Sequence, residues 1–196
     1  MSFEYAPAPE SRAVVDIKAS YGLFINGEFV DGHGSSFKTV NPATEEVLAE
    51  VAEADAADVD AAVKSARKAH RSWSRMSGAE RAKYLYRIAR IIQERGRELA
   101  VLESIDNGKP IKESRDVDIP VAAAHFFYYA GWADKLKYAG YGEESLGVAA
   151  QVIPWNFPLL MLSWKIAPAL ACGNTVVLKP AETTPLTALL FAEICQ

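Results

Sequence analysis

Residues 147–182 read GVAAQVIPWNFPLLMLSWKIAPALACGNTVVLKPAE, and this stretch decides the fold class. It begins with an almost continuous apolar run over residues 148–153, which is typical of a strand buried on both faces. Residues 158–170 predict a helix, and residues 175–178 predict a second buried strand. A strand, a helix and a strand with short connections are typical of an α/β fold with a doubly wound, Rossmann-like parallel sheet.

A further helix follows, with Thr184 as its cap and Pro185 at its first position. The first βαβα unit of the sheet is therefore predicted over residues 147–196. Two parallel strands do not make a stable sheet with helices on both faces, so we expect the sheet to be incomplete. No residue that ends a helix follows Pro185, which indicates an interrupted chain.

Upstream of the sheet, the sequence predicts small β-hairpins over residues 23–51 and a layer of helices over residues 55–137. These follow a stretch over residues 1–21 that is rich in Ala, Pro and Ser and is interpreted as a flexible tail. The dipeptide Asn26-Gly27 between apolar runs predicts a type I′ hairpin turn, because both residues tolerate positive φ. A second strand pair is expected later in the same region.

The helical layer is predicted to contain helices over residues 55–73, 78–107 and 113–137. Asp55 is expected to cap the first helix, and Gly108 to end the second. Pro120 is expected to kink or divide the third helix, because proline removes a backbone donor. The aromatic side chains of residues 126–132 recur at helical spacing, so they are interpreted as core rather than as a ligand site.

The composition describes a globular chain and excludes several classes of protein. Half of the 196 residues are hydrophobic, 23% are charged and the net charge is −4, so no nucleic acid is expected as a partner. The longest apolar stretch, residues 157–172, contains Lys165 and Pro168 and is too short to cross a bilayer. No signal peptide or disulfide framework is visible. We therefore expect a cytoplasmic protein with no membrane partner.

Polar side chains follow both predicted parallel strands at the carboxyl ends, where open α/β sheets bind ligands. Asn156 lies in a stiff loop, and its amide either donates to a developing oxyanion or satisfies a turn. Lys179 and Glu182 either grip the hydroxyls of a ribose or form a surface ion pair. Neither Cys172 nor Cys195 has the context of a nucleophile, and the three histidines lie in unrelated elements.

Several short motifs occur in a fixed order from residue 23 onward. They are FINGEFV (24–30), NPAT (41–44), DNGKP (106–110), FYYAGWA (127–133), IPWNFPL (153–159), WKIAPAL (164–170) and GNTVVLKPAE (173–182). This series resembles the aldehyde dehydrogenase superfamily. The resemblance implies an NAD(P)-dependent oxidoreductase that converts a small aldehyde to a carboxylic acid. In that family a cysteine thiolate attacks the carbonyl, a hydride passes to nicotinamide, and a glutamate activates the hydrolytic water.

The resemblance also implies roles for particular residues. Asn156 matches the donor to the oxyanion, and Lys165 matches a lysine of a charge relay, with a helix-surface lysine as the alternative. The cofactor-binding positions implied are Val152, Ile153, Pro154, Trp155, Lys179, Pro180, Ala181 and Glu182. The glutamate indicates NAD rather than NADP, because a carboxylate repels a 2′-phosphate. A monovalent-cation site is implied at Thr39, Val40, Asp106 and Thr183.

In the family, the nucleophilic cysteine and the general-base glutamate lie downstream of the region that residues 22–196 resemble. We therefore expect the N-terminal part of an NAD-binding domain, without the catalytic domain and inactive alone. The complete enzyme is expected to be a homo-oligomer, but residues 135–146 are shorter than the segment that helps to build the oligomer in family members. Two alternatives stay open: a non-catalytic module that binds a nucleotide or a partner, and a half-protein that complements another chain.

Overall fold

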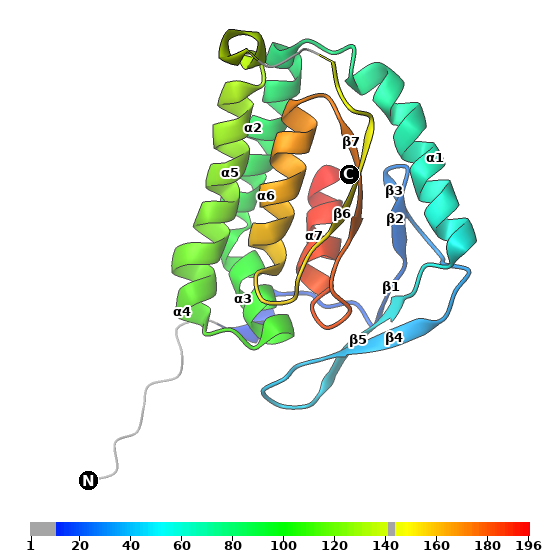
Figure 1. Cartoon of the computed structure of the whole chain (residues 1–196). Helices are drawn as coiled ribbons and strands as arrows, with labels where there is room; N and C mark the ends of the chain where they lie inside the picture. Colours follow the sequence, from blue (N-terminus) through cyan, green and yellow to red (C-terminus); the bar gives the residue numbers. More distant parts are fainter. Residues whose placement is uncertain (1–10, 141–143) are drawn as a thin grey trace.

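Figure 1 shows the computed structural model, which describes residues 11–140 and 144–196. Strands β6 (Val148–Val152) and β7 (Thr175–Lys179) pair in parallel, with Val148 opposite Thr175 and Val152 opposite Lys179. Helix α6 (Pro158–Ala171) connects them, and helix α7 (Leu186–Cys195) follows β7. The predicted strand–helix–strand–helix order and the α/β class are therefore confirmed.

Helices cover both sides of this parallel pair. Helix α1 (Ala56–Trp73) packs on one side, where the hydroxyl of Thr175 donates to the carbonyl of Ala66 at 2.9 Å. Helices α6 and α7 lie on the other side, and α6 packs in turn against α5 (Ile119–Trp132) and α2 (Gly78–Glu94) (Figure 1). The main core lies among these helices and includes Leu85, Phe126, Leu159, Leu162 and Leu186.

Side-chain caps start the first two helices. Asp55 accepts a hydrogen bond from the amide of Asp58, and the Asp58 carboxylate accepts one from the amide of Asp55, which confirms the predicted cap of α1. Ser77 and Glu80 form the same reciprocal pair at α2. Each pair satisfies amides that have no partner within their helix.

The prediction of one long helix over residues 78–107 is wrong. This segment is divided into α2 and α3 (Gly96–Asn107), because Arg95 leaves the helical conformation with φ −93° and ψ 15°. Gly96 follows directly and has a weak preference for helix, and Arg95 is held there by a 2.7 Å contact from its Nε to Glu98. Gly108 ends α3 with φ +82°, as predicted.

The third predicted helix is also divided, as the position of Pro120 indicated. A single turn, α4 (Ile111–Glu113), leads into a π-helical turn η2 (Ser114–Asp118), and Pro120 lies in the first turn of α5. Helix α5 ends at Trp132, and a 3-10 turn, η3 (Leu136–Ala139), follows.

The interpretation of residues 126–132 as core is only partly correct. Phe126 is fully buried, but Tyr128 is 59% exposed and Trp132 is 37% exposed. A helix turns about 100° per residue, so consecutive aromatic residues cannot all share its buried face. The aromatic side chains of α5 therefore serve both the core and the surface.

Two small sheets precede the helices. Strands β2 (Leu23–Ile25) and β3 (Glu28–Val30) form the predicted hairpin, and Asn26 and Gly27 have φ values of 58° and 83°. Strands β4 (Ser36–Val40) and β5 (Val47–Ala52) form the second antiparallel pair, which lies below the helices in Figure 1.

The stretch predicted as a tail is described only from residue 11; residues 1–10 lie outside the described residues. From there it contains a 3-10 turn, η1 (Arg12–Val14), and strand β1 (Ser20–Tyr21), which pairs in parallel with β5 and was not predicted. Val15 and Ile17 pack against the core. Over residues 11–140 and 144–196, no helix is long and apolar enough to cross a membrane.

Candidate functional site

Strands β6 and β7 end at the same edge of the sheet, so the loops that follow them lie together. The amide of Ile153 donates to the carbonyl of Lys179 at 3.1 Å, which ties the start of one loop to the end of the other strand. The two predicted groups of cofactor-binding positions, 152–155 and 179–182, are therefore neighbours in space. Strand ends of a parallel sheet are where ligands bind in open α/β folds.

The ammonium of Lys179 contacts the carboxylate of Glu182, and both side chains are more than half exposed. The hydrogen bond from Lys179 holds the pKa of Glu182 below its ordinary value. An exposed pair of this kind stabilises the fold by about 1 kcal/mol or less. A ligand could therefore separate the two groups at little cost in free energy. The geometry agrees equally with a ribose-binding role and with a simple surface ion pair.

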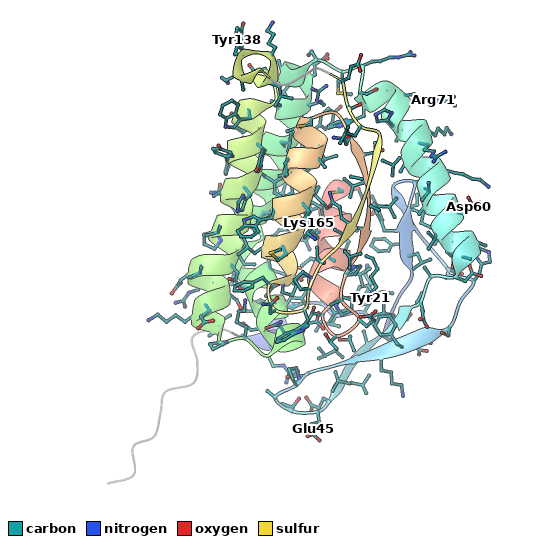
Figure 2. All side chains as sticks on the ribbon, viewed as in Figure 1. Tyr21, Glu45, Asp60, Arg71, Tyr138 and Lys165 are labelled. Atoms are coloured by element: carbon teal, nitrogen blue, oxygen red, sulfur yellow. The ribbon has the colours of Figure 1, made fainter. Side chains whose placement is uncertain are left out.

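The residues at the end of β6 differ in what they offer a ligand. Val152 is 65% exposed and Trp155 is 61% exposed. The prediction that this strand is buried on both faces is therefore wrong at the carboxyl end of β6. Ile153 is buried, so its side chain belongs to the core. Lys165, labelled in Figure 2, comes from α6. Its ammonium donates a hydrogen bond to the carbonyl of Val152, and the side-chain amide of Gln151 donates to the carbonyl of Lys165 at 2.9 Å. Lys165 therefore ties α6 to this strand end.

Asn156 lies on the exposed loop between β6 and α6. None of the described residues hydrogen bonds to its side-chain amide, although its neighbours on the loop are held. The loop enters through Pro154 and leaves through Pro158, which is buried at the start of α6. The amide of Asn156 is therefore exposed and unpaired on a restrained loop, as an oxyanion donor needs to be.

Thr39 and Asp106, two of the predicted cation ligands, are brought together and buried. The Thr39 hydroxyl donates to Asp106 Oδ1 at 2.8 Å, and the amide of Leu186 donates to Asp106 Oδ2 at 2.9 Å. Burial is the main cause that raises the pKa of Asp106 to about 6, and these two hydrogen bonds oppose it. Val40 and Thr183 are exposed. Each oxygen of the Asp106 carboxylate accepts one hydrogen bond, which leaves each oxygen a further lone pair for a cation.

Asp106 also corrects the predicted cap of α7. The hydroxyl of Thr184 is buried and has no partner among the described residues, so it caps nothing. The Asp106 carboxylate, which comes from the last turn of α3, accepts the amide of Leu186 instead. A negative charge at a helix N-terminus also interacts well with the helix dipole.

A buried polar group beneath the loop of Asn156 was not predicted. Lys109 Nζ lies 2.5 Å from Asp118 Oδ2 and 3.8 Å from the centroid of the Phe157 ring. Asn107, at the end of α3, donates its side-chain amide to the carbonyl of Trp155. The only sequence signal for these residues was the DNGKP motif, which carries no local reason for a contact with residues 155–157.

Glu103 lies in the same region and is completely buried. Neither of its carboxyl oxygens has a hydrogen-bond partner among the described residues. Burial raises its pKa to about 7, and the charge of Asp118 adds to this. The Thr187 hydroxyl and the backbone of Leu159 are near enough to oppose the rise, although neither meets hydrogen-bond geometry, and the Lys109 ammonium opposes it as well. A carboxyl in this environment favours its neutral form.

One histidine lies closer to acidic residues than the sequence indicated. The ligand atoms of His33, Asp55 and Asp58 lie within 4.8 Å of one another. The Asp58 carboxylate, however, already accepts the amides of His33 and Asp55 and contacts His33 Nδ1, which holds the pKa of Asp58 at about 2. The cluster serves as the start of α1, where the helix dipole disfavours a cation.

Comparison with known proteins identifies relatives of this chain. A model of the aldehyde dehydrogenase family matches residues 29–196. The chain is 52% identical over 185 residues to Aldehyde dehydrogenase family 2 member B4, mitochondrial, of Arabidopsis thaliana, covering 88% of this chain and 34% of that protein. It is 47% identical over 185 residues to Benzaldehyde dehydrogenase, mitochondrial, of Antirrhinum majus, covering 88% of this chain and 35% of that protein.

Solved structures give the same result. The NAD⁺ complex of an aldehyde dehydrogenase from Bacillus cereus matches with a TM-score of 0.84 at 48% identity, over 89% of this chain and 38% of that one. A C291A mutant of Aldehyde Dehydrogenase C from Pseudomonas syringae, with NAD⁺ and octanal, matches with a TM-score of 0.84 at 41% identity, over 92% of this chain and 39% of that one. The chain thus spans little more than a third of the length of these proteins.

Proposed function

This chain belongs to the aldehyde dehydrogenase family, and from that premise we propose that it supplies the oxyanion donor and part of the NAD site of an enzyme that oxidises an aldehyde to a carboxylic acid. The observation that carries the proposal is Asn156. Its amide is exposed, unpaired among the described residues and held on a loop beside the exposed Lys179–Glu182 pair. The loop that carries this donor begins beside the strand end that carries the pair, because the amide of Ile153 donates to the carbonyl of Lys179.

The donor acts on the charge that develops on the substrate. When a thiolate adds to the aldehyde carbon, the carbonyl oxygen gains a negative charge, and the amide of Asn156 donates a hydrogen bond to it. A donor fixed before the reaction costs no reorganisation at that moment, which makes it effective. The thiolate is not expected from this chain, because desolvation raises the pKa of both Cys172 and Cys195 and so disfavours their reactive forms.

We propose that the dinucleotide lies along the edge formed by residues 152–155 and 179–182. When bound, NAD accepts the hydride that leaves the substrate carbon. The residues present fit it: the Glu182 carboxylate can accept the two ribose hydroxyls, Lys179 can donate to them, and Val152 and Trp155 offer exposed apolar surface nearby. Glu182 favours NAD over NADP, because a 2′-phosphate would lie beside its negative charge. NAD⁺ complexes of the relatives from B. cereus and P. syringae support this assignment.

For the aldehyde, we propose an apolar substrate that contacts α5 and α6. Trp164 on α6 is 50% exposed, and its ring meets His125 of α5 edge to face at 5.5 Å. Tyr128 and Trp132 extend this aromatic surface along α5. The octanal complex of the P. syringae relative and the name of the A. majus relative are consistent with an apolar aldehyde.

Several finer expectations remain predictions. We expect a monovalent cation at Thr39, Val40, Asp106 and Thr183, where each oxygen of the Asp106 carboxylate keeps a lone pair beside the one hydrogen bond that it accepts. Lys165 is proposed to act by holding the end of β6, since its ammonium binds the carbonyl of Val152. A homo-oligomer, inactivity of this chain alone and a cytoplasmic location are expected from the sequence, and the relatives from A. thaliana and A. majus are named as mitochondrial.

The test replaces Asn156 by alanine in the full-length gene product and measures NADH formation from NAD and an aldehyde. Turnover should fall by roughly 10²- to 10³-fold, the usual effect of losing one oxyanion donor. Gln93→Ala, which removes an exposed amide from α2, is the matched control and should leave turnover unchanged. An Asn156→Ala enzyme with normal turnover would remove Asn156 from the mechanism. A gene product that binds NAD but oxidises no aldehyde would favour the non-catalytic module.

A further inference from the structure

Two residues at the end of α3 hold the loop of Asn156 from below. The side-chain amide of Asn107 donates to the carbonyl of Trp155, the residue before Asn156. The ammonium of Lys109 lies 3.8 Å from the centroid of the Phe157 ring, the residue after Asn156. The loop is therefore held on both sides of the proposed donor.

The contact with Trp155 bears directly on the donor. The carbonyl of Trp155 and the backbone N–H of Asn156 belong to the same peptide group, and a peptide group is planar. Fixing the carbonyl by a hydrogen bond therefore fixes the plane from which the Asn156 side chain departs. The direction of that side chain decides where its N–H points.

The contact with Phe157 depends on a buried cation. Lys109 Nζ is 2.5 Å from Asp118 Oδ2, and the side chains of Lys109 and Asp118 are only 9% and 2% exposed. A charge taken out of water is costly unless it is well paired, so the position of Lys109 is strongly determined by Asp118. A desolvated ammonium over an aromatic face attracts the ring more strongly than an exposed one does.

The backbone around these residues is shaped to bring them to the loop. Gly108, between Asn107 and Lys109, has φ +82°, and a Cβ there would lie 2.6 Å from Cγ of Pro42. Asp118 belongs to the π-helical turn η2, a rare conformation that is often found at functional sites.

We propose that Asn107 and Lys109 are positioning residues, which hold the amide of Asn156 in the direction required by the oxyanion. This inference rests on the proposed function of Asn156. A donor displaced by about 1 Å loses much of its effect, and such displacement can reduce a rate by about 100-fold. Residues that keep a donor in place therefore affect turnover without touching the substrate.

The kinetic test uses the full-length gene product. Asn107→Ala and Lys109→Met should each lower kcat by about 10- to 100-fold, with less than about a threefold change in the KM for the aldehyde, because the donor acts in the transition state. Lys109→Arg keeps a cation near the ring and should lose less activity than Lys109→Met. Ser114→Ala is the matched control: Ser114 is buried in the same layer and bonds to Ser104 at 3.0 Å, without contact to the loop.

A double-substitution test separates positioning from general destabilisation. In an Asn156→Ala background, Asn107→Ala or Lys109→Met should change kcat by less than about threefold, because they act through a donor that is no longer there. Losses that multiply with that of Asn156→Ala would overturn the inference. If Asn156→Ala alone has normal turnover, the proposed function fails. If it is slow but the substitutions at Asn107 and Lys109 are silent, only the present inference fails.

Crystal structures of the full-length variants give a readout that needs no activity. Asn107→Asp keeps the size of the side chain and removes the donor, so it should fold even if a smaller residue does not. The B-factors of residues 155–157, relative to the chain mean, should be higher in Asn107→Asp and Lys109→Met than in Ser114→Ala. Equal B-factors of this loop in all three variants would show that it is not held by these contacts.

Discussion

Replacing Glu103 by Gln should change how stability depends on pH. Relative to the wild type, the Glu103→Gln variant should gain free energy of unfolding as the pH rises from acidic to alkaline values. The side chain of Glu103 is 0% exposed, and neither carboxyl oxygen has a hydrogen-bond partner among the described residues. Burial disfavours the ionised form and raises the pKa of Glu103 from 4.5 to about 7. Glutamine has nearly the same shape and never ionises, so it removes this titration from the folded state.

The sign and size of the effect follow from proton linkage. Below pH 4.5 the carboxyl is protonated in both the folded and the unfolded chain, and its full contribution to stability is present. As the pH rises through 7, the folded state loses its tighter-bound proton and must hold a buried charge. At about 1.4 kcal/mol per pKa unit, the raised pKa means that ionisation of Glu103 lowers the free energy of unfolding of the wild type by about 3 kcal/mol. The Glu103→Gln variant does not lose this free energy.

The assay is urea unfolding followed by tryptophan fluorescence between about pH 4.5 and pH 8.5. The free energy of unfolding of Glu103→Gln, minus that of the wild type, should rise by about 3 kcal/mol across this range, with its midpoint between the two pKa values. Any cost of burying the glutamine amide is constant with pH and does not affect the trend. Glu94→Gln removes an exposed carboxyl from α2 and controls for the change in net charge. A difference that stays constant with pH would refute the reasoning.

Two further predictions concern Asp106 and Glu182. Asp106→Ala leaves the amide of Leu186 and the hydroxyl of Thr39 without their partner, so the free energy of unfolding should fall by about 2–4 kcal/mol in urea titrations at pH 7; an unchanged value would show that Asp106 does not cap α7. Glu182→Gln should weaken NAD binding by up to about fivefold, the factor expected for an exposed charge, and weaken NADP less, as measured by isothermal titration calorimetry. Equal effects on both cofactors would argue against a contact between Glu182 and the ribose.

The parts of the fold that were predictable depend on local sequence. The hairpin at Asn26-Gly27 follows from two residues that accept positive φ, and its geometry is confirmed. The βαβα order follows from apolar runs and a helical segment between them. The break at Arg95 was missed because the apolar stripe continues across it, although Gly96, a residue with a weak preference for helix, marks its position.

The same distinction applies to the candidate site. The sequence could place the loop of Asn156 beside the strand end of Lys179 and Glu182 because a parallel sheet brings the carboxyl ends of its strands together, which requires only the order of the elements. Asn107 and Lys109 were missed because their partners lie 48 residues away on a different element. No local pattern in DNGKP specifies that the end of α3 meets the loop after β6.

Helix α3 therefore does more than cover the core. Three of its polar residues contact parts of the fold that surround the candidate site: Asp106 caps α7, Asn107 binds the loop of Asn156, and Glu103 is buried near Thr187 and Lys109. Apolar side chains in place of Asp106 and Glu103 would avoid the cost of burying ionisable groups. Their presence is consistent with a layer that fixes the positions of α7 and the loop, because hydrogen bonds and charges specify geometry more sharply than apolar contacts do. On this interpretation, the helical layer determines the direction of the Asn156 side chain, which we propose as the oxyanion donor, and the parallel sheet determines only its location.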